Sequence, residues 1–155
     1  MKFALLAAAL IALGSPAFAD QIQLEGDQSQ WFIEIRLPID MPNPTHTVPF
    51  TLDTGCAECW VTMDNGILFE MWRAGHAHQV ATDPVVGIDG LMNAQPVYEL
   101  DGFTIGDCHI PGPITAEGSS GANLIGENLL AQLHSVVQLD KGVWTFQCPT
   151  QRKRK

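Results

Sequence analysis

Positive charge is nearly missing from the body of this 155-residue chain. Between positions 20 and 150 the only basic residues are Arg36, Arg73 and Lys141, whereas all 17 acidic residues lie there, so this body carries a net charge of −14. Such a surface repels nucleic acids and anionic membranes. We therefore expect no nucleic-acid partner. Four further basic residues lie in the tail 151–155, which we interpret as a solvated end.

Long apolar runs are also missing. The longest, residues 3–13, is too short to span a bilayer, which needs about 20 residues. It follows Lys2 and precedes Ala17-Phe18-Ala19, the small-x-small pattern of a cleavage site. This order predicts a signal peptide over residues 1–19, with a membrane anchor or a buried N-terminal helix as the alternative.

A cleaved signal peptide would leave Asp20 as the first residue, one domain over residues 20–150, and the basic tail. The residue directly after the cleavage site is not a cysteine, and no later segment is long and apolar enough to be transmembrane. We therefore expect a periplasmic or secreted protein without a membrane anchor after the signal peptide is removed.

Cysteine is scarce: the chain has only Cys56, Cys59, Cys108 and Cys148. An even number of cysteines in an oxidising compartment indicates disulfides, and four thiols allow three pairings. We favour a structural pairing of Cys108 with Cys148, because both lie near the ends of predicted strands.

Helical periodicity is scarce as well, and strand patterns dominate. We expect Asp64-Asn65-Gly66 to form a tight turn and Pro111 and Pro113 to interrupt the chain after a strand. The sum predicts an all-β domain rather than regular strand–helix alternation. The predicted strands cover residues 31–37, 48–52, 60–63, 103–110, 135–139 and 143–146, with an extended hairpin over 80–98 and short helices over 67–74 and 127–134.

Two short motifs are the features of the sequence that indicate catalytic chemistry. Asp53-Thr54-Gly55 follows the apolar strand 48–52 directly, although an Asp that caps its own turn would give the same pattern. Leu124-Ile125-Gly126 comes about 70 residues later, just before the second predicted helix.

Together these motifs resemble those of retropepsin-like aspartic proteases, in which an apolar-x-Asp-Thr-Gly loop is paired with an apolar-apolar-Gly segment that crosses beneath it. Phe103-Thr104-Ile105-Gly106 also resembles the strand turn that follows the flap in this family. The resemblance covers about residues 31–146. It implies an all-β, retropepsin-like acid protease fold, a closed, barrel-like domain with one or two short helices.

The resemblance implies an aspartic endopeptidase that cleaves a peptide or protein substrate and needs no metal or cofactor. Two carboxylates side by side share one proton and activate a water, and aspartic proteases are the known example of this arrangement. The chain has one Asp-Thr-Gly, so the second Asp53 must come from another copy in a homodimer. Thr54 would then bond across the dimer axis, and Gly55 would let backbone approach the substrate.

Other residues receive supporting roles from the same resemblance. Leu124, Ile125 and Gly126 would support the Asp53 loop from beneath. A flap over residues 80–93 would close on the peptide, with Gly87 and Gly90 giving it mobility.

The sequence departs from the family at two positions. Cys56 stands where Ala or Ser is usual, and Glu127 stands where retroviral enzymes carry an arginine that stabilises the dimer. Cys56 and Cys59 also form a C-x-x-C, which in a thiol oxidoreductase precedes a helix. A strand pattern follows here instead, which disfavours redox catalysis.

Two further alternatives remain. His76 and His78, with His109 and His134 elsewhere, could be metal ligands, although we interpret them as exposed loop residues. A retropepsin fold could also serve as an inactive binding or assembly module of the periplasm, because fold alone does not establish chemistry.

Overall fold

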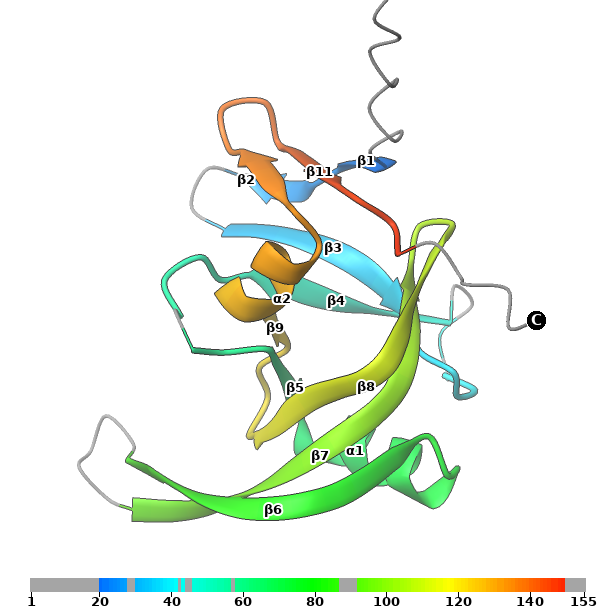
Figure 1. Cartoon of the computed structure of the whole chain (residues 1–155), viewed down its shortest axis with the longest axis vertical. Coiled ribbons are helices and arrows are strands. Elements are labelled where there is room, and N and C mark those ends of the chain that lie inside the picture. The colour runs from blue at the N-terminus through cyan, green and yellow to red at the C-terminus, as the bar shows by residue number, and fades with distance from the viewer. Residues whose placement is uncertain are drawn as a thin grey trace, which may run out of the picture.

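The computed structural model describes residues 20–27, 30–41, 43, 46–56, 58–86 and 92–149, and is mostly β-structure (Figure 1). The predicted signal peptide, the tail 151–155, Gly87 and Gly90 lie outside the described residues. The strands are β1 (Asp20–Gln23), β2 (Glu25–Asp27), β3 (Gln30–Arg36), β4 (Thr47–Leu52), β5 (Val61–Asp64), β6 (Ala77–Val86), β7 (Met92–Ile105), β8 (Cys108–Ser119), β9 (Leu124–Ile125), β10 (Val136–Gln138) and β11 (Val143–Phe146), and the helices are α1 (Asn65–Arg73) and α2 (Glu127–Gln132).

Eight of the strands form one sheet in the order β2-β3-β4-β9-β5-β8-β7-β6. The sheet curls back on itself, because β3 also pairs with β7 through Ile35 opposite Ile105 and Arg36 opposite Thr104. A second sheet has the order β1-β11-β10. The predicted all-β class with short helices is confirmed, and the closure of the main sheet is partial.

The core follows from the period-2 pattern of the strands. In β3, Ile33 and Ile35 are buried, whereas Glu34 and Arg36 are exposed, as the alternation predicted. The strands of both sheets contribute large side chains to one continuous core. Its largest fully buried members include Phe50, Phe103, Trp144 and Phe146.

The first helix begins where the sequence predicted a tight turn. Asp64 ends β5, and its Oδ1 accepts hydrogen bonds from the amides of Gly66 (2.9 Å) and Ile67 (3.4 Å). It is therefore an N-cap, and Asn65 is already the first helical residue. The predicted turn was wrong because the same Asp-Asn-Gly pattern also suits a helix start when apolar residues follow at helical spacing, here Leu68 and Met71 on the buried face.

The segment predicted as one strand, 103–110, instead covers the end of one strand, a turn and the start of the next strand. β7 ends at Ile105, residues 106 and 107 form the turn, and β8 begins at Cys108. β8 also runs through Pro111 and Pro113, which were expected to interrupt the chain. The β7–β8 register shifts between Leu100 and Gly102, opposite these prolines, and a bulge tolerates residues that lack a ladder donor.

The two ends of the described domain lie together. β1 pairs with β11, with Asp20 opposite Phe146, and Cys108 at the start of β8 is bonded to Cys148 just beyond β11. The favoured pairing of Cys108 with Cys148 is thus confirmed, with a Cα–Cα distance of 5.7 Å. Among the described residues no helix is both long and apolar enough to cross a bilayer.

Candidate active site

The site is built where a two-residue strand passes between two longer ones. β9 pairs in parallel with β4, Leu52 lying opposite Ile125, and antiparallel with β5, Val61 lying opposite Ile125. β4 and β5 are the strands that enter and leave the Asp53 loop. The apolar-apolar-Gly segment therefore crosses between the two strands that flank the loop.

Hydrogen bonds join the two motifs directly. The amide of Asp53 donates to the carbonyl oxygen of Ile125 (2.9 Å), and the amide of Gly126 donates to the carbonyl oxygen of Trp60 (2.9 Å). Both ends of the loop are thus fixed to the same short strand. Ile125 is fully buried and Gly126 is buried, so the support beneath the loop belongs to the core.

The loop itself faces outward. Asp53 is partly buried, whereas Thr54 and Gly55 are exposed. The Oδ1 of Asp53 accepts a hydrogen bond from the amide of Gly55 (2.9 Å), which is the turn-capping bond that Asp makes two residues before the donor. The capping role and a chemical role are compatible, because one oxygen takes this bond and the carboxylate stays at the surface.

The loop is also bonded to α2. The amides of Glu127 and Asn128 donate to the carbonyl oxygens of Cys56 (3.2 Å) and Cys59 (3.1 Å). The side-chain Nδ2 of Asn128 donates to the carbonyl oxygen of Glu58 (2.9 Å). Sequence reasoning missed Asn128 as a support residue, and its only sequence signal was a polar side chain between Glu127 and the apolar Leu129.

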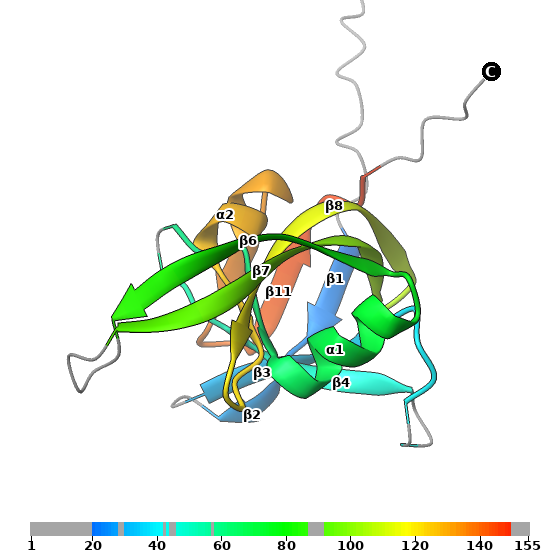
Figure 2. The same cartoon turned by 90° about the horizontal axis from the view of Figure 1, so that it is seen from below.

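A long hairpin extends on the same side of the molecule as the loop (Figures 1 and 2). β6 and β7 pair from Ala77 opposite Leu100 out to Val86 opposite Met92. The extended hairpin expected near residues 80–98 is therefore present. The flap glycines Gly87 and Gly90 are among the residues not described.

Comparisons with known proteins address the fold. No protein-family model matches the sequence, and no curated protein matches it. Among solved structures, the chain is similar to a retropepsin-like aspartic protease from Rickettsia conorii, with a TM-score of 0.53, 14% identity, and coverage of 83% of this chain and 91% of that one. It is also similar to the retroviral protease-like domain of Ddi1 from Leishmania major, with a TM-score of 0.53, 10% identity, and coverage of 79% and 95%.

The chain has a retropepsin-like fold. The fold class expected from the motifs is confirmed, and the likeness at these identities concerns the fold rather than the chemistry. Within this fold, the Asp53 loop, the crossing strand β9 and the helix α2 occupy one contiguous region.

A disulfide joins Cys56 to Cys59 within the loop of this retropepsin-like domain, with a Cα–Cα distance of 5.3 Å. Both cysteines lie between β4 and β5 in irregular backbone, and neither begins a helix. A thiol oxidoreductase needs its first cysteine at a helix N-terminus, where the helix dipole stabilises the thiolate. The geometry thus agrees with the sequence argument against redox catalysis.

Two surface hollows flank β4, one near each end. The first has a volume of about 500 Å³ and is lined by Phe32 of β3, Thr51 of β4 and Leu124 of β9, among others. Thr51 lies two residues before Asp53, so this groove opens beside the loop.

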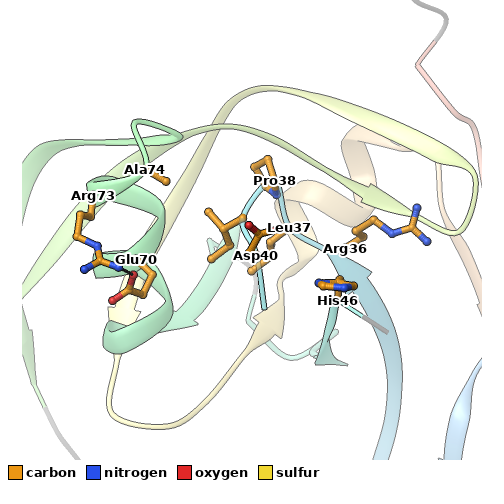
Figure 3. Close-up of a pocket in the computed structure, with 9 residues that line it drawn as sticks. Arg36, Leu37, Pro38, Asp40, His46, Glu70, Arg73 and Ala74 are labelled. Carbon is orange, nitrogen blue, oxygen red and sulfur yellow. Dashed lines mark hydrogen bonds and ion pairs between the residues drawn. The ribbon is translucent and has the colours of Figure 1, made fainter. Parts of the chain in front are cut away.

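The second hollow, of about 670 Å³, lies at the opposite end of β4, between α1 and the segment after β3 (Figure 3). Glu70 and Arg73 of α1 form an ion pair on one side, with 2.6 Å between Oε2 and Nη2, and Arg36 and His46 lie on the other. This hollow is separate from the Asp53 loop, and both signs of charge line it.

The histidine pair lies beside a carboxylate at the base of the hairpin. The Nδ1 of His76 lies 3.5 Å from Asp101 Oδ2, and the Nε2 of His78 lies 3.7 Å from Asp101 Oδ1. His78 is exposed, as expected, and His76 is partly buried. Among the described residues, the one set of three possible metal ligands that converge is Asp20, Cys108 and Cys148, and those two sulfurs are already bonded to each other.

Proposed function

We propose that this retropepsin-like protein is an aspartic endopeptidase that works as a homodimer on peptide or protein substrates. The observation that carries the proposal is the crossing of β9 beneath an outward-facing Asp53 loop, with the Asp53 amide bonded to Ile125. A carboxylate at the surface of a rigid support suits a catalytic group, because its position is fixed while it stays accessible to substrate.

The chemistry requires a second carboxylate. In the proposed dimer, two Asp53 side chains lie close together and share one proton, because like charges so close cannot both ionise. The ionised partner removes a proton from a water that attacks the peptide carbonyl, and the protonated partner donates its proton to the carbonyl oxygen. The proton taken from the water then passes to the leaving amine as the C–N bond breaks, and the other carboxylate recovers a proton from the hydroxyl group as the carbonyl re-forms. The proton belongs to the pair.

Other residues take roles in the same proposal. Thr54 and Gly55 are exposed in the single chain, which agrees with contacts that a second copy or a substrate would make. Leu124, Ile125 and Gly126 support the loop. Residues 80–93, with Gly87 and Gly90, would form the flap.

We further propose that residues 1–19 direct export, so that residues 20–150 function in the periplasm or outside the cell. Two disulfides fit an oxidising compartment, where thiols pair and persist.

The first test is the substitution Asp53→Asn in the mature protein. We expect purified protein to cleave unstructured peptides between acidic and neutral pH, and Asp53→Asn to lower kcat/KM by about 10²–10⁴-fold or more. Asp140→Asn is the matched control, because Asp140 is exposed and also begins an Asp-x-Gly turn. Absence of cleavage by the unmodified protein, with a stable dimer, would favour the inactive binding module.

The second test addresses the shared dyad. Sedimentation should show a dimer, and an equal mixture of unmodified and Asp53→Asn chains should exchange subunits. After random exchange, a quarter of the dimers would hold two carboxylates. The mixture contains twice as many dimers as the unmodified chains alone, so its activity should be about half that of the same amount of unmodified chains measured alone. A protein that stays monomeric, or a mixture that keeps full activity after exchange, contradicts the proposed dyad.

A further inference from the structure

Helix α2 begins without a side-chain cap. Its N-cap residue is Gly126, which has no side chain to accept the first amides of the helix. Carbonyl oxygens of the Asp53 loop accept them instead: Cys56 bonds to the amide of Glu127, and Cys59 bonds to the amide of Asn128. The start of α2 and the loop after Asp53 are therefore one bonded unit.

The two residues that supply these carbonyls are the two that the short disulfide joins. The Cys56 carbonyl oxygen accepts a second hydrogen bond from the amide of Cys59 (3.3 Å), which closes the same turn through the backbone. The disulfide thus fixes the separation of both acceptors for α2. Without this disulfide, the carbonyl group of either cysteine would be free to rotate away from the amides of α2.

The same turn connects to Asp53 through a short path. Cys56 follows Gly55, whose amide donates to the Oδ1 of Asp53 at 2.9 Å. At the other side, the Asp53 amide is bonded to Ile125, immediately before Gly126. A shift of Cys56 therefore moves the donor that orients the carboxylate.

We propose that the Cys56–Cys59 disulfide is a positioning element of the active site. It holds the carbonyl oxygens of both cysteines against the first amides of α2, and it maintains the orientation of the Asp53 carboxylate through the Gly55 amide. The cysteines touch no reacting atom, so they are positioning residues. The catalytic part of this inference rests on the proposed peptidase function, whereas the loop–helix part does not.

The chain offers a matched control. Cys108–Cys148 joins the start of β8 to the end of the domain, 40 residues apart, whereas Cys56–Cys59 spans three. Loop-closure entropy grows with the length of the closed segment. Cys108→Ser/Cys148→Ser should therefore lower Tm more than Cys56→Ser/Cys59→Ser.

The experiment compares these two double variants in the full mature protein by amide hydrogen exchange and by kinetics. In Cys56→Ser/Cys59→Ser, exchange should become faster at Asp53, Glu127 and Asn128, with kcat about 10- to 100-fold lower and KM changed by less than about threefold. In Cys108→Ser/Cys148→Ser, those three amides and kcat should stay near the values of the unmodified protein. Cys56→Ala/Cys59→Ala, which introduces no hydroxyl groups, repeats the test if the serine variant folds poorly.

Unchanged exchange at the three amides overturns the proposal, as does faster exchange with unchanged kcat in a protein that cleaves peptide. Equal loss of kcat in both double variants also overturns it, because that would indicate general destabilisation. If the unmodified protein cleaves no peptide, the peptidase proposal fails, and hydrogen exchange alone decides whether the disulfide holds the loop on α2.

Discussion

The two motif glycines, Gly55 and Gly126, lie close in the fold but have opposite surroundings. Gly126 is buried, and a Cβ added there would overlap the Cys59 carbonyl oxygen and lie 2.5 Å from the Cys59 Cβ. Gly55 is exposed, and a Cβ added there would meet only the Oδ1 of Asp53, at 3.3 Å. Neither glycine has a backbone φ in the left-handed region, so the difference concerns space alone.

This difference distinguishes two reasons why a position would require glycine. At Gly126 the chain itself requires the absence of a side chain, because backbone of the Asp53 loop passes directly against it. At Gly55 the rest of the described chain leaves the space open, and only the carboxylate is near. A requirement for glycine at position 55 would therefore come from something outside the single chain, such as a substrate, a water or a second copy.

The largest expected effect on stability is that of Gly126→Ala. Its Cβ meets backbone atoms, which cannot rotate away, so the loop or β9 must shift. We expect a loss of about 1–3 kcal/mol or more in the free energy of unfolding, as for overpacked cores. Urea denaturation at a fixed protein concentration measures it, since the proposed dimer would make stability depend on concentration. A loss below about 0.5 kcal/mol would show that the close packing on Cys59 is not maintained in solution.

The crossing of the two motifs was expected from their resemblance to those of retropepsin-like aspartic proteases, and not from the residues alone. The residues alone indicated two apolar side chains and a glycine, Leu124, Ile125 and Gly126, just before a predicted helix. The position of Asp53 at the end of an apolar strand followed directly from the pattern of residues 48–52.

Features that depend on long-range packing could not be predicted. Asp64-Asn65-Gly66 fits a turn and a helix start equally well, and only the packing of α1 decides between them. Pro111 and Pro113 suggested a break, but the bulge that admits them depends on β7. The acceptors for the first α2 amides are backbone carbonyl oxygens of the loop. Every residue type has such a carbonyl, so the sequence does not indicate which ones act as acceptors.

Asn128→Ala should have an effect on the free energy of unfolding between those of Gly126→Ala and Gly55→Ala. It removes the hydrogen bond from Asn128 Nδ2 to the Glu58 carbonyl oxygen, which is one contact between the buried support and the exposed loop. One exposed hydrogen bond contributes about 0.5–1.5 kcal/mol, so we expect a loss in that range by urea denaturation. Gln132→Ala, exposed on the same helix, is the control and should change stability by less than about 0.5 kcal/mol. Equal effects of the two substitutions would mean that the bond to Glu58 contributes nothing.

The smallest expected effect on stability is that of Gly55→Ala, which should instead affect function. Ala suits the backbone conformation and meets no backbone atom, so the free energy of unfolding should change by less than about 0.5 kcal/mol. The added methyl group would nevertheless lie against Asp53 Oδ1 and in the space that a substrate or second copy would enter. We therefore expect kcat/KM for peptide cleavage to fall by about 10-fold or more, because a small displacement of a catalytic group is costly. If Gly55→Ala destabilised the fold as much as Gly126→Ala, position 55 would be constrained by the chain itself, and the contrast between an open functional glycine and a packed structural one would be wrong.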